Sequence, residues 1–215
     1  NWYQIAELRS HPLHDPHGAI EAYELIIHDH RARSALKGLY TDLNHFEALY
    51  YLFAHELPLV SEQREQVELY LAMGHLSQHE LNLPEQALSH YRELLSISSL
   101  HAPVKEALEQ LMQVQGVLFE KDASFELGVV ELLHPFYVSE ENTNALLRCT
   151  QLRLKHTANP LGQAPLWEQM HTLHLAQKDW DAAIHSLGQA FKTHATVTLW
   201  DRLGHLCEQH ERWEA

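Results

Sequence analysis

The sequence has few of the residues that interrupt or cross-link a fold. Its 215 residues include only eight Gly, eight Pro and two Cys. Pro84 and Pro103 fall at predicted helix starts, where a missing amide hydrogen costs little. Cys149 and Cys207 fall in different predicted helices, which favours free thiols and a reducing compartment. We therefore expect a cytoplasmic location, with the periplasm as the alternative.

Long apolar runs and basic residues are also scarce. No run of eighteen apolar residues occurs, so no segment is expected to insert into a membrane. Lys and Arg number 15 against 29 Asp and Glu, which gives a formal net charge of −14. This charge disfavours nucleic acid and anionic membrane surfaces as partners, and it favours a basic or neutral protein.

The common catalytic motifs are missing as well. The sequence contains no glycine-rich phosphate loop and no nucleophile elbow, and neither Cys has a context that marks it as reactive. We therefore predict that the chain is not an enzyme, with no catalytic residue and no cofactor.

Histidine, in contrast, is abundant, with 19 residues. His75 and His79 lie four residues apart on one predicted helix, and His171 and His174 lie three apart on another. Each pair shares a helical face, but a tight zinc site needs three or four ligands and neither pair completes one. No metal site is assigned, and a metal-dependent enzyme using one of these pairs is the less favoured alternative.

The same histidines make the surface charge sensitive to pH. Their full protonation would change the formal charge from −14 to −14 + 19 = +5. Partner binding that depends on this overall charge should therefore weaken or invert below about pH 6.

The main positive feature is an internal repeat. The stretch "WEQMHTLHLAQKDWDAAIHSLGQAF" from Trp167 shares its frame with "YLAMGHLSQHELNLPEQALSHYRELL" from Tyr70 and with "WYQIAELRSHPLHDPHGAIEAYELII" from Trp2. Apolar residues recur at three and four residues on both sides of a break, which predicts two helices per copy. The predicted core comprises Trp2, Ile5, Ala19, Tyr23, Tyr70, Met73, Ala87, Tyr91, Trp167, Met170, Ala183 and Leu187.

The spacing of the copies indicates a longer, compound unit. Ala19 and Ala87 are 68 residues apart, or two units of 34, and a degenerate helix pair fits between them. Ala183 follows Ala87 by 96 residues. In addition, "LYTDLNHFEALYYL" from Leu39 resembles "FYVSEENTNALLRC" from Phe136. A compound unit of one clean and one degenerate pair is therefore itself repeated.

These patterns resemble the tetratricopeptide repeat family, and most closely its long bacterial arrays. Trp167, Met170, Ala183 and Leu187 stand at the signature positions, while His171 replaces the usual Gly. The resemblance implies an all-α, right-handed superhelix of about twelve helices. We predict a single solenoid over 1–215, with clean repeats near 1–30, 64–97 and 163–194 and degenerate units near 31–60, 102–157 and 196–215.

The resemblance also implies a function. The family binds protein or peptide partners on the wall formed by the first helix of each pair, so a non-enzymatic scaffold or adaptor is expected. A self-assembly module of a larger complex, and so a homo-oligomer, is the alternative. The predicted wall residues are Tyr3, Glu7, Arg33, Lys37, Tyr40, Leu71, His75, Gln78, His79, Glu168 and Thr172.

Neither end of the sequence shows the polar cap of a terminal repeat. Trp2 already occupies the signature aromatic position, and Trp213 and Ala215 match Phe46 and Ala48 at the beginning of a second helix. We therefore expect the chain to be a piece of a longer array, whose apolar ends pack on further repeats or on another copy.

Overall fold

The computed structural model describes residues 1–11, 13–118 and 122–209, and these residues form an all-α protein. They contain twelve α-helices, a short 3-10 helix and a short π-helix, and no strand. The predicted fold class is therefore confirmed. The chain divides into two compact units, Asn1–Ser99 and Leu100–Ala215. The prediction of one continuous solenoid remains a prediction, and the expected helix start at Trp213 lies outside the described residues.

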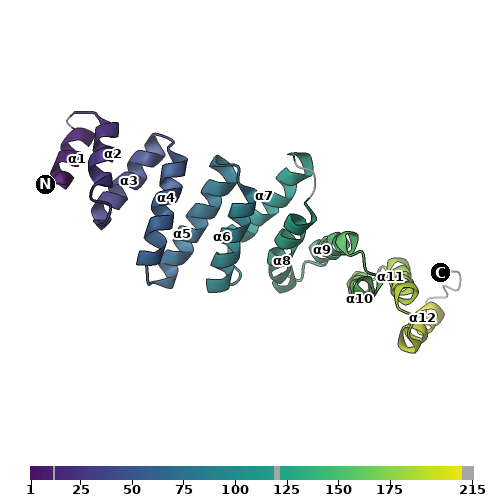
Figure 1. Cartoon of the computed structure of the whole chain (residues 1–215). Coiled ribbons are helices and arrows are strands. Elements are labelled where there is room, and N and C mark those ends of the chain that lie inside the picture. The colour runs from purple at the N-terminus through teal and green to yellow at the C-terminus, as the bar shows by residue number, and fades with distance from the viewer. Residues whose placement is uncertain (12, 119–121, 210–215) are drawn as a thin grey trace. The chain divides into compact units, whose positions relative to one another are not determined.

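The first unit contains six α-helices, and successive helices pack on one another (Figure 1). The short helices η1 and η2 extend α4 and α5, respectively. The bounds are α1 Trp2–Ser10, α2 Pro16–Glu24, α3 His30–Asp42, α4 Phe46–Glu56, η1 Leu57–Leu59, α5 Gln63–His75, η2 Leu76–Glu80 and α6 Pro84–Ile97.

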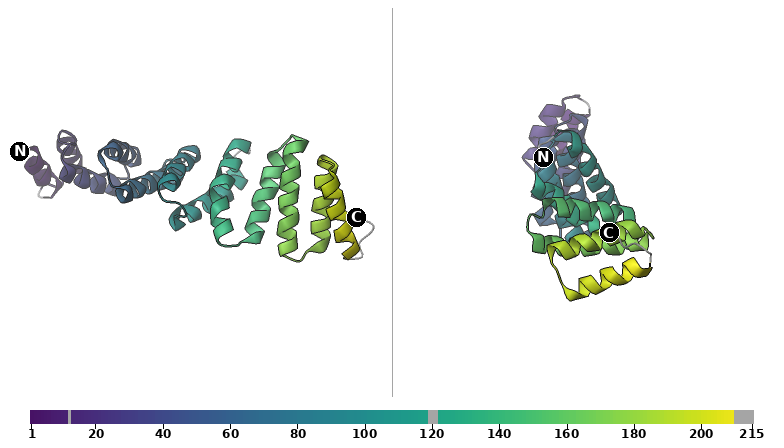
Figure 2. Two further views of the ribbon diagram at one scale, coloured as in Figure 1. Left: turned by 90° about the horizontal axis from the view of Figure 1, so that it is seen from below. Right: turned by 90° about the vertical axis from the view of Figure 1, so that its right-hand side faces the viewer.

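The described residues of the second unit also form six α-helices. Figure 2 shows α8 to α11 as hairpins of adjacent helices in green to yellow, and α10 and α11 form its most extensive helix pair. The bounds are α7 Ala102–Leu118, α8 Ala123–Ser139, α9 Thr143–His156, α10 Pro160–Ala176, α11 Trp180–Thr193 and α12 Val197–Gln209.

Short polar side chains set the helix starts. Asp15, Asp29, Asn142, Asn159 and Asp179 each precede a helix, and each side chain accepts a hydrogen bond from a backbone amide of the first turn. Such caps satisfy amide groups that have no partner within the helix. The break predicted within each of the three copies is confirmed, because α1 and α2, η2 and α6, and α10 and α11 are separate helices.

The turns between helices repeat in the two units. Asn44 and Glu141, which are 97 residues apart, both adopt the left-handed conformation, with φ of 56° and 52°. Asn82 and Lys178, which are 96 apart, do the same with φ of 53° and 59°. Non-glycine residues seldom adopt this conformation, so its recurrence at matched positions supports the compound repeat.

A tyrosine–glutamate hydrogen bond between neighbouring helices also recurs in the two units. The Tyr40 hydroxyl on α3 donates to Glu24 Oε1 on α2 at 2.6 Å, and the Tyr137 hydroxyl on α8 donates to Glu109 Oε1 on α7 at 3.0 Å. Burial, the first cause in each case, raises the pKa of both tyrosines. Helix α7 therefore packs on α8 as α2 packs on α3.

Most of the predicted core is confirmed, with two errors at α1. Tyr70 and Trp167 are half-buried, but Trp2 is 50% exposed and Ile5 is 38% exposed. Their counterparts in α5 also pack next to α4, whereas α1 packs mainly on α2, so the same face is left open. The correctly predicted buried residues are Ala19, Tyr23, Met73, Ala87, Tyr91, Met170, Ala183 and Leu187.

The close-packing position of the clean repeat is filled in two ways. In the first unit Gly74 lies against the Tyr91 ring, so that a Cβ at Gly74 would overlap the ring carbons. In the second unit His171 takes the position of Gly74, and Leu187 takes that of Tyr91. The His171 imidazole is buried, and its Nδ1 lies 3.0 Å from the Ala183 carbonyl oxygen. The Gly and Tyr of the first unit are thus replaced by His and Leu at the same repeat positions of the second unit.

Candidate functional site

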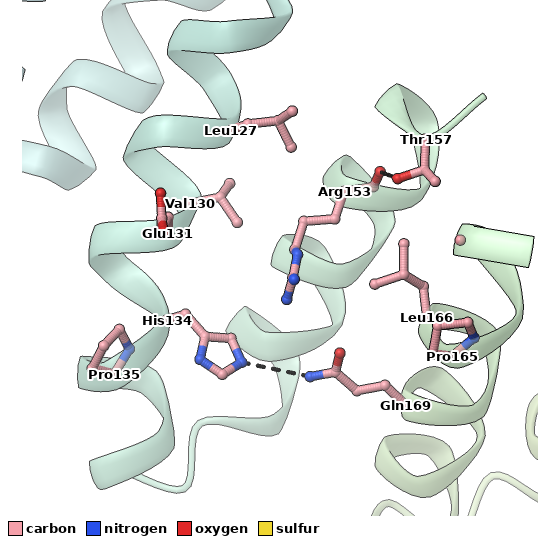
Figure 3. A pocket seen from close by; sticks show the side chains of 11 residues that line it. Leu127, Val130, Glu131, His134, Pro135, Arg153, Thr157, Pro165, Leu166 and Gln169 are labelled. Atoms are coloured by element: carbon pink, nitrogen blue, oxygen red, sulfur yellow. Dashed lines mark hydrogen bonds between the residues drawn. The ribbon is translucent and has the colours of Figure 1, made fainter. Parts of the chain in front are cut away.

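A groove of about 620 Å³ lies between α8, α9 and α10 in the second unit (Figure 3). All three helices contribute side chains, and α9 lies between the other two along the chain. A cavity of this size falls in the range of small-molecule and peptide-anchor pockets. Its lining residues are Leu127, Val130, Glu131, His134, Pro135, Arg153, Thr157, Gly162, Pro165, Leu166 and Gln169.

One part of the groove is apolar. Leu127 and Val130 come from α8, and Leu166 comes from α10. Val130 and Leu166 are buried, and Leu127 is half-buried. Apolar atoms also make up more of the lining surface than polar atoms do. This part can therefore bury an aliphatic or aromatic side chain of a ligand.

The other part is polar and holds a neutral histidine. Gln169 Nε2 on α10 lies 3.5 Å from His134 Nε2 on α8, the long limit for a hydrogen bond in which the amide donates. Burial lowers the pKa of His134, and the positive charge of Arg153 lowers it further. His134 is therefore neutral at pH 7.

Arg153 supplies a cation to the groove. Its side chain extends from α9 into the space between α8 and α10 (Figure 3). Within the described part of the chain, no carboxylate lies within ion-pair distance of its guanidinium. Glu131, the one acidic residue of the lining, is exposed on α8. The guanidinium thus has donors available for a ligand.

Two prolines in the lining leave backbone carbonyls of their helices without the usual donors. Pro135 lies inside α8 and Pro165 lies inside α10. A proline has no amide hydrogen, so the carbonyls four residues earlier, at Glu131 and Leu161, lose their ordinary helical donors. Each helix that flanks the groove therefore has a backbone carbonyl that lacks its helical donor.

The predicted wall residues do not line this groove. Five of them hold the first unit together through contacts of their own. Arg33 Nη1 donates to the carbonyls of Ile27 and His28, both at 3.0 Å. Gln78 Oε1 accepts from the Tyr91 hydroxyl at 2.8 Å. The others in this group are Tyr3, which packs edge-on against Tyr23, Lys37, which pairs with Glu56, and Tyr40, which donates to Glu24.

The remaining predicted residues are more accessible. Glu7, His75, His79 and Thr172 are exposed, and Leu71 is half-buried. Glu168 on α10 accepts a hydrogen bond from Arg202 on α12 at 2.8 Å. The structure brings His75 and His79 into ring contact, with centroids 5.9 Å apart. The binding role of all eleven residues remains a prediction.

Metal binding has no support in the described part of the chain. No group of three or more His, Cys, Asp or Glu is placed to hold a metal ion there. Cys149 and Cys207 are free and buried, and burial raises the pKa of the Cys149 thiol to about 11. That thiol is thus protonated and unreactive at neutral pH. None of the described helices is long and apolar enough to cross a membrane.

Sequence reasoning missed the groove, although one signal pointed to it. The match between Leu39 and Phe136 has an offset of 136 − 39 = 97 residues. With the same offset, the predicted wall residue Lys37 corresponds to His134, since 134 − 37 = 97. Extending the match backwards along α8 would therefore have identified His134. Arg153 would not have been found, because it lies on the second helix of its pair.

Comparison with known proteins identifies no family. No family model and no curated protein sequence matches the chain. Among solved structures, the chain is similar to the TPR2AB domain of yeast Sti1 in its complex with pHSP90, at 10% identity and a TM-score of 0.40. This match covers 98% of this chain and 83% of that one. A second match is BtubC (BKLC) from P. vanneervenii, at 16% identity and a TM-score of 0.31, covering 97% of this chain and 80% of that one. At these scores neither likeness assigns a binding site.

Proposed function

We propose that the chain is a non-enzymatic interaction module that binds an extended segment of a partner protein in the α8–α10 groove. The observation that carries this proposal is the composition of the groove. It combines an apolar part at Leu127 and Leu166, a polar part at His134 and Gln169, and the cation Arg153. Binding sites typically combine apolar walls with a few well-placed polar groups.

The two flanking prolines favour an extended peptide over a compact small molecule. An extended chain presents a backbone amide at regular intervals, and the carbonyls of Glu131 and Leu161 have lost their usual helical donors. Recognition through main-chain hydrogen bonds supplies affinity, while side-chain pockets supply selectivity. The same groove contains no nucleophile with an adjacent base, so acyl transfer is not proposed.

A peptide selection tests this function directly. Peptides selected from a random display library against the intact chain should bind in the groove. The substitution Gln169→Trp places a large ring in the lining and should reduce their affinity about tenfold or more. The matched control is Gln151→Trp, at an exposed position of α9. Affinities would be measured by fluorescence anisotropy. Failure to select binders, or binders that are indifferent to Gln169→Trp, would contradict the proposal.

Self-assembly is a second candidate, favoured by the open face of α1. Trp2, Ile5 and Leu8 are 50%, 38% and 57% exposed. On α5, the repeat position of Ile5 is held by Met73, which is buried at 3% exposure. A second copy that covered this face would make the chain a concentration-dependent dimer. Sedimentation should then show association of the chain but not of its Trp2→Lys/Ile5→Lys variant. A chain that stays monomeric at high concentration would exclude this candidate.

A further inference from the structure

The two compact units place different charges at matched positions. The offset of 97 residues that relates α3 and α4 to α8 and α9 pairs Glu56 with Arg153, since 153 − 56 = 97. It also pairs Lys37 with His134, and Arg33 with Val130, since 130 − 33 = 97. A carboxylate flanked by two cations in the first unit thus corresponds to a cation in the second.

In the first unit this carboxylate is supplied by the chain itself. Glu56 on α4 pairs with Lys37 Nζ, and its Oε1 lies 3.5 Å from Arg33 Nε, at ion-pair distance. The side chains of Arg33 and Glu56 are 11% and 15% exposed, so this interaction is largely shielded from water. The charges at these positions are therefore paired within the chain.

In the second unit the matched positions lack such a carboxylate. Arg153 replaces Glu56, and its guanidinium has no acidic partner within the described residues. Gln169 lies across the groove on α10 and carries an amide NH₂ that can donate. Glu131 on α8 is the only acidic side chain in the lining, and it is exposed. Arg153 is itself exposed, so a ligand in the groove can reach this cation.

We propose that the α8–α10 groove selects a partner segment carrying an acidic side chain, whose carboxylate binds Arg153 and accepts a second hydrogen bond from Gln169. An apolar residue next to the acidic one would contact Leu127 and Leu166. This inference rests on the proposed function and names the ligand class of the same groove. Arg is well suited to this role, because its planar guanidinium can bind both oxygens of a carboxylate.

The cation in the groove and the net charge of the chain favour partners of opposite sign. The net charge of −14 favours a basic partner at long range. Salt screens that long-range repulsion over about 8–10 Å at physiological strength, whereas a pair formed inside a groove is screened less. The contact with Arg153 can therefore determine which side chain binds, although it does not accelerate association.

The charge of the selected peptides is the first test. Peptides selected from a random display library against the intact chain should be enriched in Asp and Glu next to an apolar residue. Replacing the acidic residue of a selected peptide by Gln should weaken its binding about tenfold or more, since a hydrogen bond between charged groups is lost. Replacing it by Lys should weaken binding further.

The charge of the protein is the second test. The substitution Arg153→Glu installs the residue that the first unit has at this position, and it should reverse the preference so that Lys-substituted peptides bind best. The matched control, Arg148→Glu, changes an exposed residue of the same helix that does not line the groove. It should leave the preference unchanged. Thermal unfolding would verify that both variants remain folded.

The outcomes separate this inference from the proposed function. Binders that respond to Gln169→Trp but carry no acidic residue, or that bind the Arg153→Glu variant unchanged, would overturn the charge selectivity and leave the interaction module intact. If no peptides are selected, both proposals fail. Acidic peptides whose preference reverses with Arg153→Glu would support both.

Discussion

The two compact units use one helical repeat for different purposes. The first unit places Arg33, Lys37 and Glu56 together and pairs both cations with the one carboxylate. The second unit has Arg153 at the position of Glu56 and a groove of about 620 Å³ beside it. The turn conformations and the tyrosine–glutamate contacts are the same in both. A repeat can therefore keep its backbone fixed while the charges between its helices change from stabilising the fold to being available for a ligand.

The largest expected effect comes from exchanging the close-packing residues between the units. The substitution Gly74→His introduces the residue of the second unit, but the Tyr91 ring occupies the space that it needs. We expect a loss of about 3 kcal/mol in the free energy of unfolding, the upper part of the usual range for overpacking. Urea titration followed by circular dichroism would measure it.

The double variant Gly74→His/Tyr91→Leu provides the control for this exchange. It reproduces the combination of His171 and Leu187, which the second unit accommodates. It should recover at least part of the stability that the single variant loses. A double variant as unstable as Gly74→His alone would show that the two positions are not interchangeable as a pair.

The next largest expected effect comes from Glu56, the carboxylate that pairs with two cations in the first unit. Glu56→Gln removes the carboxylate that pairs with Lys37 and lies near Arg33. Because Arg33 is 9% exposed, its charge would remain in a poorly solvated position. We expect a loss of about 2 kcal/mol, below the cost of breaking a fully buried pair, because Lys37 reaches water. Glu93→Gln, at an exposed position of α6, is the control and should change stability by less than about 0.5 kcal/mol.

A smaller effect should arise from a histidine–glutamate hydrogen bond in the second unit whose matched positions in the first unit hold other residues. His156 Nε2 on α9 lies 2.6 Å from Glu126 Oε2 on α8, and the matched residues of the first unit are Leu59 and Asp29. The hydrogen bond from His156 lowers the pKa of Glu126, with a smaller contribution from Lys155. The stabilisation is therefore full above the ordinary Glu value of about 4.3, and it is lost as the pH falls through the lower value of the folded chain.

Glu126→Gln tests that assignment. It should cost about 1 kcal/mol at pH 7, and the loss should shrink in acid, where the native pair is also broken. Chemical unfolding at a series of pH values would measure the difference between variant and parent. Glu106→Gln, at an exposed position of α7, is the control. A loss from Glu126→Gln that is the same at every pH would argue against a stabilising role for the Glu126 charge.

The sequence predicted the helix pairs because their signals are local. Apolar spacing, short polar caps such as Asp179 and the breaks between helices all act within a few residues. The burial of Trp2 and Ile5 was predicted wrongly because burial depends on the neighbouring helices. Helix α5 packs next to both α4 and α6, whereas α1 packs mainly on α2. The position of a residue within the repeat does not specify which helices cover it.

The groove was harder to predict, for a related reason. The family resemblance predicts ligand contacts on the first helix of each pair, whereas Arg153 lies on the second helix of a degenerate pair. At Arg33 and Tyr40, the resemblance points to ligand contacts, but both side chains bind groups of this chain. Whether a polar side chain is used internally or is free for a ligand depends on tertiary neighbours, which a one-dimensional pattern does not specify.

The smallest expected effect is a pH dependence of peptide binding that isolates His134. Burial, followed by the charge of Arg153, lowers the pKa of His134 in the free chain, so it is neutral at pH 7. The groups that face it are Glu131 on its own helix, Arg153 on α9 and Gln169 on α10. A bound carboxylate would favour protonated His134 and raise its pKa in the complex. Affinity for an acidic peptide should therefore increase as the pH falls from 7 towards 5, by about twofold to fivefold.

Protonation of the other histidines also makes the surface more positive over this range, and it would strengthen binding of any acidic peptide. The variant His134→Gln separates the two contributions, because it leaves the remaining histidines unchanged. Its affinity, measured by anisotropy at high salt to screen the surface, should vary less with pH than that of the parent chain. Parallel pH profiles for the two proteins would assign the whole dependence to the surface and would remove His134 from the binding site.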